Sequence, residues 1–175
     1  MNLLQSACLV LLLGAAAGCS QQSIGSGDSV MEHVTLKDDR VGANAGNGKT
    51  AWIDSTGALE IEGQLVALGP EQRVLTMEYR ASAHAIRDQG IEIGESGAKI
   101  AGTAVNGVVD GLRNGNSDQI GSKVEAEARA IEAHAKMLCA KIGQLRARQD
   151  SLAAAVPAFL PYATVTDKTV ADCRA

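Results

Sequence analysis

The stretch Leu59–Gln72, LEIEGQLVALGPEQ, decides the fold class because its hydrophobic pattern changes period midway. Leu59 and Ile61 alternate with acidic residues, which is typical of a half-buried β-strand, and the following Gly63 favours a turn into a second strand. Pro70 then indicates the first turn of a helix, where its missing N–H costs nothing. A hairpin that leads directly into a helix predicts an α+β domain.

The residues before this hairpin also carry β signals. Short apolar pairs are separated by turn formers such as Asn47-Gly48 and Ser55-Thr56-Gly57, and these residue types favour chain reversal. We therefore expect a small antiparallel β-meander of three to five strands over about residues 30–68. The apolar face of such a sheet needs a cover.

Apolar residues recur at helical spacing after the hairpin. We expect helices at about 70–89, 95–113 and 117–155, because glycines interrupt the pattern at 90–94 and polar residues at 114–117. The third helix has the clearest signal, an apolar ladder seven residues apart formed by Val124, Ile131, Leu138, Leu145 and Leu152. The ladder could mediate a parallel homodimer, but its second column is mostly alanine, so packing on a neighbouring helix of the same domain is favoured.

The C-terminal residues 157–175 are expected to form an extended tail. Pro157 and Pro161 prevent continuation of the third helix. Phe159 and Tyr162 are expected to dock on the domain, since aromatics make up only 2% of the chain and serve best as packing anchors.

The N-terminus carries a targeting signal. Residues 16–20, Ala-Ala-Gly-Cys-Ser, close an apolar run that begins at Leu9 and resemble the lipobox of bacterial lipoproteins. The resemblance implies a lipoprotein signal peptide over 1–18 and lipid attachment at the Cys19 thiol. It also implies that Ser20 directs the protein to the outer membrane, facing the periplasm. An ordinary cleaved signal peptide or a short uncleaved anchor stays open, because residues 1–8 contain no Lys or Arg.

Residues 19–29 are rich in Gly and Ser and should form a flexible tether. Residues 30–175 are within the usual size of a single domain. We therefore expect one α+β domain that stands off a membrane to which it is held by its N-terminal lipid.

Two cysteines remain in the predicted domain, Cys139 and Cys173. An even pair in an oxidising periplasm is typical of a disulfide. The chain-entropy model gives such a bridge about 3–4 kcal/mol of stabilisation. Two free buried thiols remain the alternative.

The charge balance disfavours nucleic acid as a partner. The formal net charge is −4, so there is no basic field to attract phosphates. The stretch Ala43–Thr50 matches a permissive phosphate-loop pattern around Gly48-Lys49-Thr50. Because no helix follows it to direct amides at a phosphate, we predict a hairpin loop and no nucleotide binding.

No residue pattern predicts catalysis or a cofactor. His33, His84 and His134 do not stand at metal-ligand spacing on one predicted element. No Gly-x-Ser-x-Gly motif indicates an activated serine. The sequence therefore predicts no catalytic, cofactor-binding or metal-binding residues and favours a protein that is not an enzyme.

The stretch Leu59–Leu68, followed by Gln72 and Tyr79, resembles the YggN-like proteins, a family of secreted or lipid-anchored proteins of Gram-negative bacteria. The resemblance spans about Val34–Arg113. It implies a location in the cell envelope and brings no catalytic residue.

These observations together predict an outer-membrane-anchored periplasmic lipoprotein that binds another envelope component, such as an envelope protein. The alternative is a periplasmic enzyme or small-ligand carrier whose site is assembled from dispersed polar residues. A deep pocket with convergent carboxylates, or with His84 beside His134, would favour that alternative.

Overall fold

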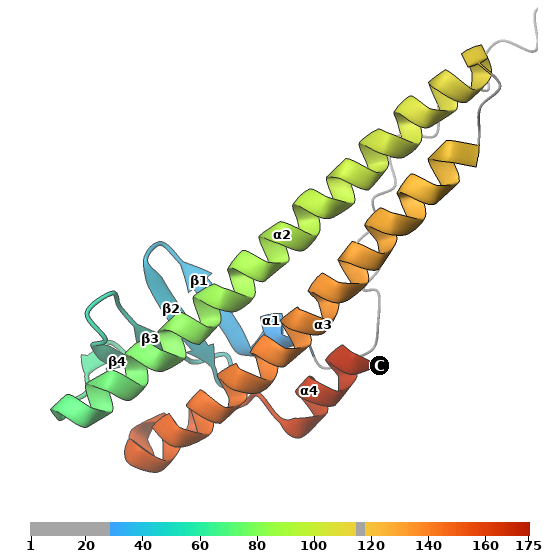
Figure 1. The fold of residues 1–175 in the computed structure, drawn as a ribbon. Coiled ribbons are helices and arrows are strands. Elements are labelled where there is room, and N and C mark those ends of the chain that lie inside the picture. The colour runs from blue at the N-terminus through green and yellow to red at the C-terminus, as the bar shows by residue number, and fades with distance from the viewer. Residues whose placement is uncertain (1–28, 115–117) are drawn as a thin grey trace, which may run out of the picture.

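The computed structural model describes residues 29–114 and 118–175 (Figure 1). The predicted signal peptide, Cys19 and most of the predicted tether lie outside these residues. The described chain has an α+β fold in which one antiparallel sheet packs against long helices. The predicted fold class is therefore confirmed.

The sheet has five strands in the order β1-β2-β3-β4-β5, each antiparallel to the next, which confirms the meander. Tight turns make this possible: Asp38 has φ 55° between β1 and β2, and the Glu62-Gly63 turn between β4 and β5 has φ 51° and 79°. The meander begins later than expected, because Ser29 caps a one-turn helix through its hydroxyl. These elements are α1 (Val30–His33), β1 (Val34–Lys37), β2 (Arg40–Asn44), β3 (Thr50–Ile53), β4 (Leu59–Ile61) and β5 (Gln64–Leu65).

The expected break at residues 90–94 is wrong, because α2 (Pro70–Asn114) is one continuous helix of 45 residues. Glycine in a helix interior costs about 1 kcal/mol relative to alanine but still donates its N–H, so a long helix can absorb it. The helix begins at Pro70, as predicted. Gly69 N donates to Gln72 Oε1 over 2.9 Å, which satisfies an amide at the start of α2.

The long helix α3 (Asp118–Ala155) runs antiparallel to α2 (Figure 1). Gln72 Nε2 donates to the Ala155 carbonyl over 2.7 Å and so joins the start of α2 to the end of α3. Two surface ion pairs lie on α3, Glu125 with Arg129 and Glu132 with Lys136. None of the helices in the described ranges combines the length and apolar content that crossing a bilayer requires.

The expected extended tail is wrong for most of its length. The chain forms a 3-10 helix, η1 (Pro157–Tyr162), and then α4 (Asp167–Arg174). Proline tolerates the tight 3-10 turn, and Thr166 begins α4 by accepting a hydrogen bond from the Thr169 amide. Phe159 and Tyr162 are buried, so the predicted docking of the aromatics is confirmed.

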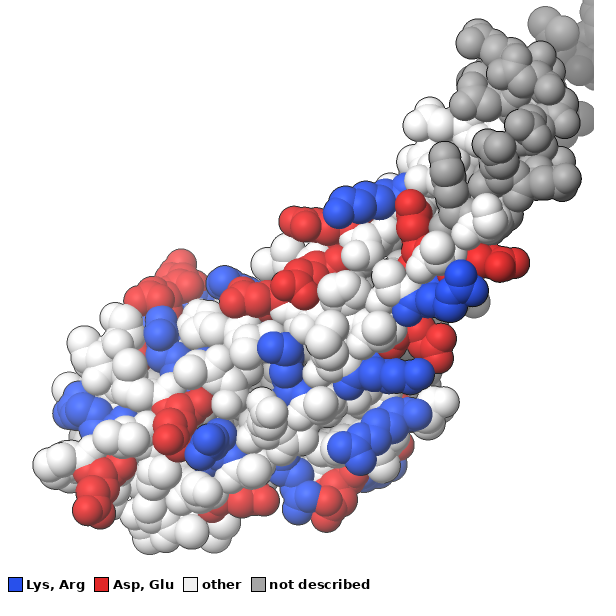
Figure 2. Space-filling view, in the orientation of Figure 1, with Lys and Arg blue, Asp and Glu red and all other residues white. Residues whose placement is uncertain are grey.

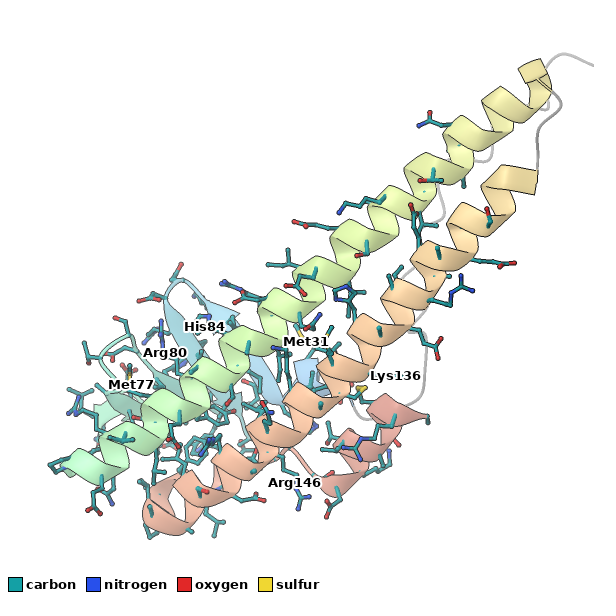
Figure 3. The ribbon with its side chains drawn as sticks, in the orientation of Figure 1. Met31, Met77, Arg80, His84, Lys136 and Arg146 are labelled. Carbon is teal, nitrogen blue, oxygen red and sulfur yellow. A yellow bond between two sulfur atoms is a disulfide. The ribbon has the colours of Figure 1, made fainter. Side chains whose placement is uncertain are left out.

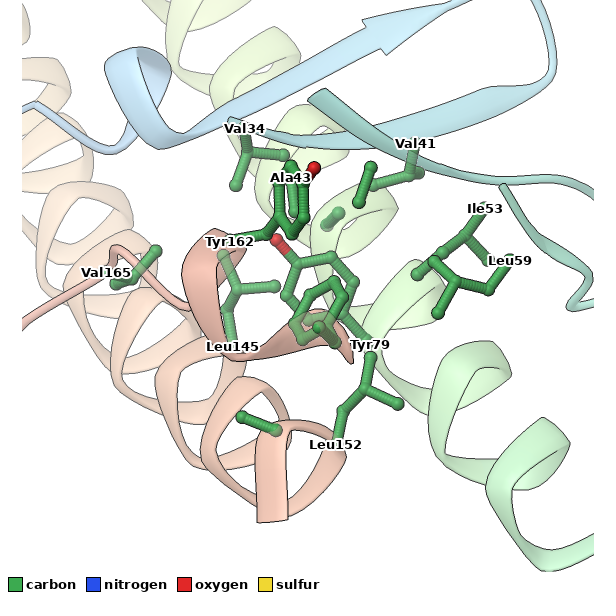
Figure 4. Packing of buried hydrophobic residues seen from close by; sticks show 14 of the residues in the cluster. Val34, Val41, Ala43, Ile53, Leu59, Tyr79, Leu145, Leu152, Tyr162 and Val165 are labelled. Atoms are coloured by element: carbon green, nitrogen blue, oxygen red, sulfur yellow. The ribbon is translucent and has the colours of Figure 1, made fainter. Parts of the chain in front are cut away.

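The core lies between the sheet, the first half of α2, the second half of α3 and η1 (Figure 4). Tyr79 and Phe159 meet edge to face with ring centroids 5.6 Å apart. Leu145 and Leu152, the last two members of the heptad ladder, have no exposed surface, and they pack inside this domain.

Beyond the sheet, α2 and α3 continue together as a two-helix arm (Figure 1), which we define as residues 92–114 and 118–137. The described side chains of the arm include no buried hydrophobic residue. Its contacts are partly polar, as where Thr103 Oγ1 donates to Glu127 Oε1 over 3.3 Å. A Cβ added at Gly97 would contact nothing within 4 Å, so this glycine does not serve a close approach of the two helices.

Candidate functional site

An open groove of about 600 Å³ lies where the arm meets the body of the protein. This volume is within the range of ligand pockets in proteins. Its walls come from α1, β1, α2, α3 and α4, elements that are far apart in the sequence. The lining residues are Ser29, Val30, Met31, Val34, Leu36, Ala83, Ile86, Arg87, Gly90, Ile91, Leu138, Ile142, Thr169, Asp172 and Cys173.

The groove begins where the hydrophobic core ends. Ala83 and Ile86 are buried on α2, whereas Ile91, just over one turn beyond Ile86, is 52% exposed. On the opposite side, Met31 is 68% exposed and lies between α2 and α3 in the view of Figure 3. Large apolar side chains therefore line a site that is open to solvent.

One wall of the groove is fixed by the cysteine pair. The sulfur atoms of Cys139 on α3 and Cys173 on α4 are 2.04 Å apart, a disulfide with 5.6 Å between the Cα atoms. This bond holds α4 against α3, and with it Thr169, Asp172 and Cys173 on the groove wall.

Two charged side chains are among the described residues that line the groove. Arg87 forms an ion pair with its sequence neighbour Asp88, with 2.9 Å between Nη2 and Oδ1. Asp172 pairs with Lys168 one turn earlier on α4. Over the face shown in Figure 2, basic and acidic side chains are interspersed, and no large area carries a single sign.

The three histidines lie on different parts of the fold, and none lines the groove. His33 Nδ1 is 3.0 Å from the Thr164 hydroxyl, and His134 Nδ1 is 2.9 Å from Gln89 Nε2 and 3.4 Å from Glu92 Oε2. Among the described residues, no three His, Cys, Asp or Glu side chains come together as metal ligands would.

His84 lies on the side of α2 that faces the β1–β2 hairpin, beside Arg80 (Figure 3). Burial, with added repulsion from the Arg80 guanidinium, lowers the pKa of His84 from its usual value. Its Nε2 is buried without a hydrogen-bond partner. Among the described residues no carboxylate is arranged to orient this imidazole as a general base, since the nearby Asp39 pairs with Arg80 and Asp88 pairs with Arg87.

The phosphate-loop match is a hairpin loop between β2 and β3, as predicted. The Ala45 amide donates to the Lys49 carbonyl and the Gly48 amide to the Ala45 carbonyl. Lys49 forms an ion pair with Glu62. Neither these backbone amides nor the lysine is arranged to hold a phosphate, because a β-strand follows the loop.

The groove was not predicted from the sequence. A signal was present on α2, where Ala83, Ile86 and Gly90 place apolar and small residues on one face just as the core residues run out. The other walls could not be assigned, because the positions of α1 and α4 depend on tertiary packing.

No protein-family model, no curated protein and no solved structure matches the chain. The groove and the N-terminal sequence therefore carry the functional argument.

Proposed function

We propose that this protein is a lipid-anchored envelope protein that binds another envelope component and performs no catalysis. Cys19 carries the lipid, the signal peptide 1–18 is removed, and the domain stands on the periplasmic side of the outer membrane. The lipobox-like sequence at 16–20 and the resemblance to the YggN-like proteins support this location.

The open apolar groove is the observation that supports binding. A site that excludes water with Val, Leu and Ile side chains gains free energy by burying an apolar ligand. Among its described lining residues Asp172 is the one carboxylate, and none is a histidine. Its composition is that of a binding surface.

The volume of the groove favours a second candidate, a small-ligand carrier. About 600 Å³ is enough for a small molecule and is too little for a folded partner domain. In this case the protein would carry an apolar molecule within the periplasm.

The anchor is tested by metabolic labelling with palmitate, with and without globomycin. We expect label on the wild-type protein, none on Cys19→Ala, and accumulation of the unprocessed chain when globomycin blocks the signal peptidase. An unlabelled wild-type protein would exclude the lipid anchor and leave an ordinary signal peptide or an uncleaved anchor.

The binding function is tested by crosslinking in intact membranes, followed by identification of the attached proteins and lipids. Gly90 lines the groove, and a Cβ there would meet nothing within 4 Å, so Gly90→Phe should fill the groove. Gly94 is also exposed and a Cβ there would meet nothing within 4 Å, but it does not line the groove, so Gly94→Phe is the matched control. We expect a component enriched over an unrelated lipid-anchored protein and lost only in Gly90→Phe. Equal recovery with the unrelated protein contradicts the proposal.

A further inference from the structure

We propose that the ligand of the groove is a single-chain amphiphile: one aliphatic chain lies in the groove and an anionic head group pairs with Arg87. This inference rests on the proposed binding function and names its ligand class. Three features of the groove support this inference: its apolar floor, the charges at its rim and its open end.

The floor of the groove selects an aliphatic chain. It is formed by Val34, Leu36, Ile86, Leu138 and Ile142, without an aromatic ring or a polar group among them. Aliphatic side chains complement a chain of methylene groups through dispersion contacts and exclusion of water. A polar or planar ligand would find no hydrogen-bond partner or stacking surface there.

The rim of the groove selects an anion. Arg87 and Asp172 are its charged residues, and Asp172 is paired with Lys168 on its own helix. Arg87 pairs with Asp88 on the exposed surface, where side chains of both residues are more than half exposed. Such a pair contributes little to stability, so the guanidinium can exchange Asp88 for a carboxylate or phosphate of a ligand.

The open end of the groove fits an amphiphile that is only partly enclosed. Met31 and Ile91, the exposed apolar residues of the lining, lie at its margin. They can follow a chain that extends out of the groove. An amphiphile keeps its head group in water while its chain is buried.

The experiment uses the full chain in phosphatidylcholine vesicles and hexadecanoate carrying a diazirine at mid-chain as the probe. After irradiation, we expect adducts on peptides that contain Ile86–Ile91 and Leu138–Ile142. Gly90→Phe should reduce this labelling about fivefold or more, because a benzyl group occupies the space of several methylenes. Gly94→Phe should label within about twofold of wild type, and circular dichroism should show that both variants are folded.

The head group is tested with Arg87→Gln. We expect labelling by the carboxylate probe to fall about threefold to fivefold, the size of an exposed ion pair. Labelling by the corresponding alcohol probe should not change, because the alcohol carries no charge. Unlabelled carboxylates of increasing chain length should compete with the probe. Their affinity should rise about fourfold for each added methylene until the groove is filled.

Several outcomes overturn the inference. These are adducts outside the groove, equal labelling of the two glycine variants, competition without chain-length dependence, and no labelling of the wild type. Capture in the membrane crosslinking experiment distinguishes the two proposals. If capture depends on Gly90 while the probe fails, the binding function holds and the ligand class is wrong; if both fail, both are wrong.

Discussion

Tyr79 shows how a single residue limits the stability of the core. Its side chain has no exposed surface, and its hydroxyl is buried without a hydrogen-bond partner. Removing an unsatisfied buried polar group while keeping the ring can be neutral or stabilising. We therefore expect Tyr79→Phe to leave the free energy of unfolding unchanged or to raise it by about 1 kcal/mol, measured by urea denaturation at pH 7.

The same residue makes stability depend on pH. Burial raises the pKa of Tyr79 well above its usual value. As the pH rises above about 10, the unfolded chain can release this proton and the folded chain cannot. The wild type should therefore lose stability in this range, and Tyr79→Phe should lose less. Equal alkaline losses in the two proteins would show that other groups cause the effect.

At the scale of elements, α2 contains glycines whose small size is not required by any neighbouring side chain. Gly94 is exposed and a Cβ there meets nothing, so Gly94→Ala should raise the free energy of unfolding by about 0.5–1 kcal/mol. Gly57 is the opposite case, with φ 76° and a Cβ position 2.8 Å from Met77 Cγ. Gly57→Ala should destabilise by about 1 kcal/mol or more. Thermal unfolding of both variants tests the distinction.

The disulfide joins the C-terminal helix α4 to α3. The helix α4 has eight residues and contacts α3 as its main neighbour. Replacing both cysteines by alanine should lower the free energy of unfolding by about 2–4 kcal/mol, because the unfolded chain loses a 34-residue closed loop. Added reductant should lower the free energy of unfolding of the wild type and should not change that of the variant. Free alkylation of Cys139 and Cys173 in protein purified from the periplasm without reductant would contradict the bridge.

Elements with local signals were predicted and elements that depend on tertiary contacts were not. The strand hairpin at Leu59 and the helix start at Pro70 follow from alternation and turn chemistry. The break expected at Gly90 failed because glycine only weakens a helix, and α3 lies alongside to support it. The helices α1 and α4 and the groove between them could not be predicted, since α1 is placed by its contacts with β1 and β2 and α4 by its packing against α3 and the disulfide.

At the scale of the whole molecule, stability is unevenly distributed. The body combines a sheet, η1 and two helix halves around buried aromatics, whereas in the described part of the chain each helix of the arm packs against the other alone (Figure 1). Several apolar residues of the arm are exposed, as Val105 is at 65%, and none of its described hydrophobic side chains is buried. A helix pair that buries so little apolar surface gains little from packing.

The arm should therefore open independently of the body, with the groove at the boundary between them. We expect amide hydrogen exchange in residues 92–107 and 124–137 to be at least about a hundredfold faster than in residues 79–86 and 139–152. The physical reason is that local opening of the arm exposes few buried side chains, whereas opening of the body exposes Tyr79, Leu145 and Leu152. Exchange followed by mass spectrometry measures both regions in one sample. Equal protection along α2 would show that the arm is held by contacts beyond its own two helices. The same measurement with added hexadecanoate shows whether the amides of Gly90 and Ile91 gain protection when the groove is filled.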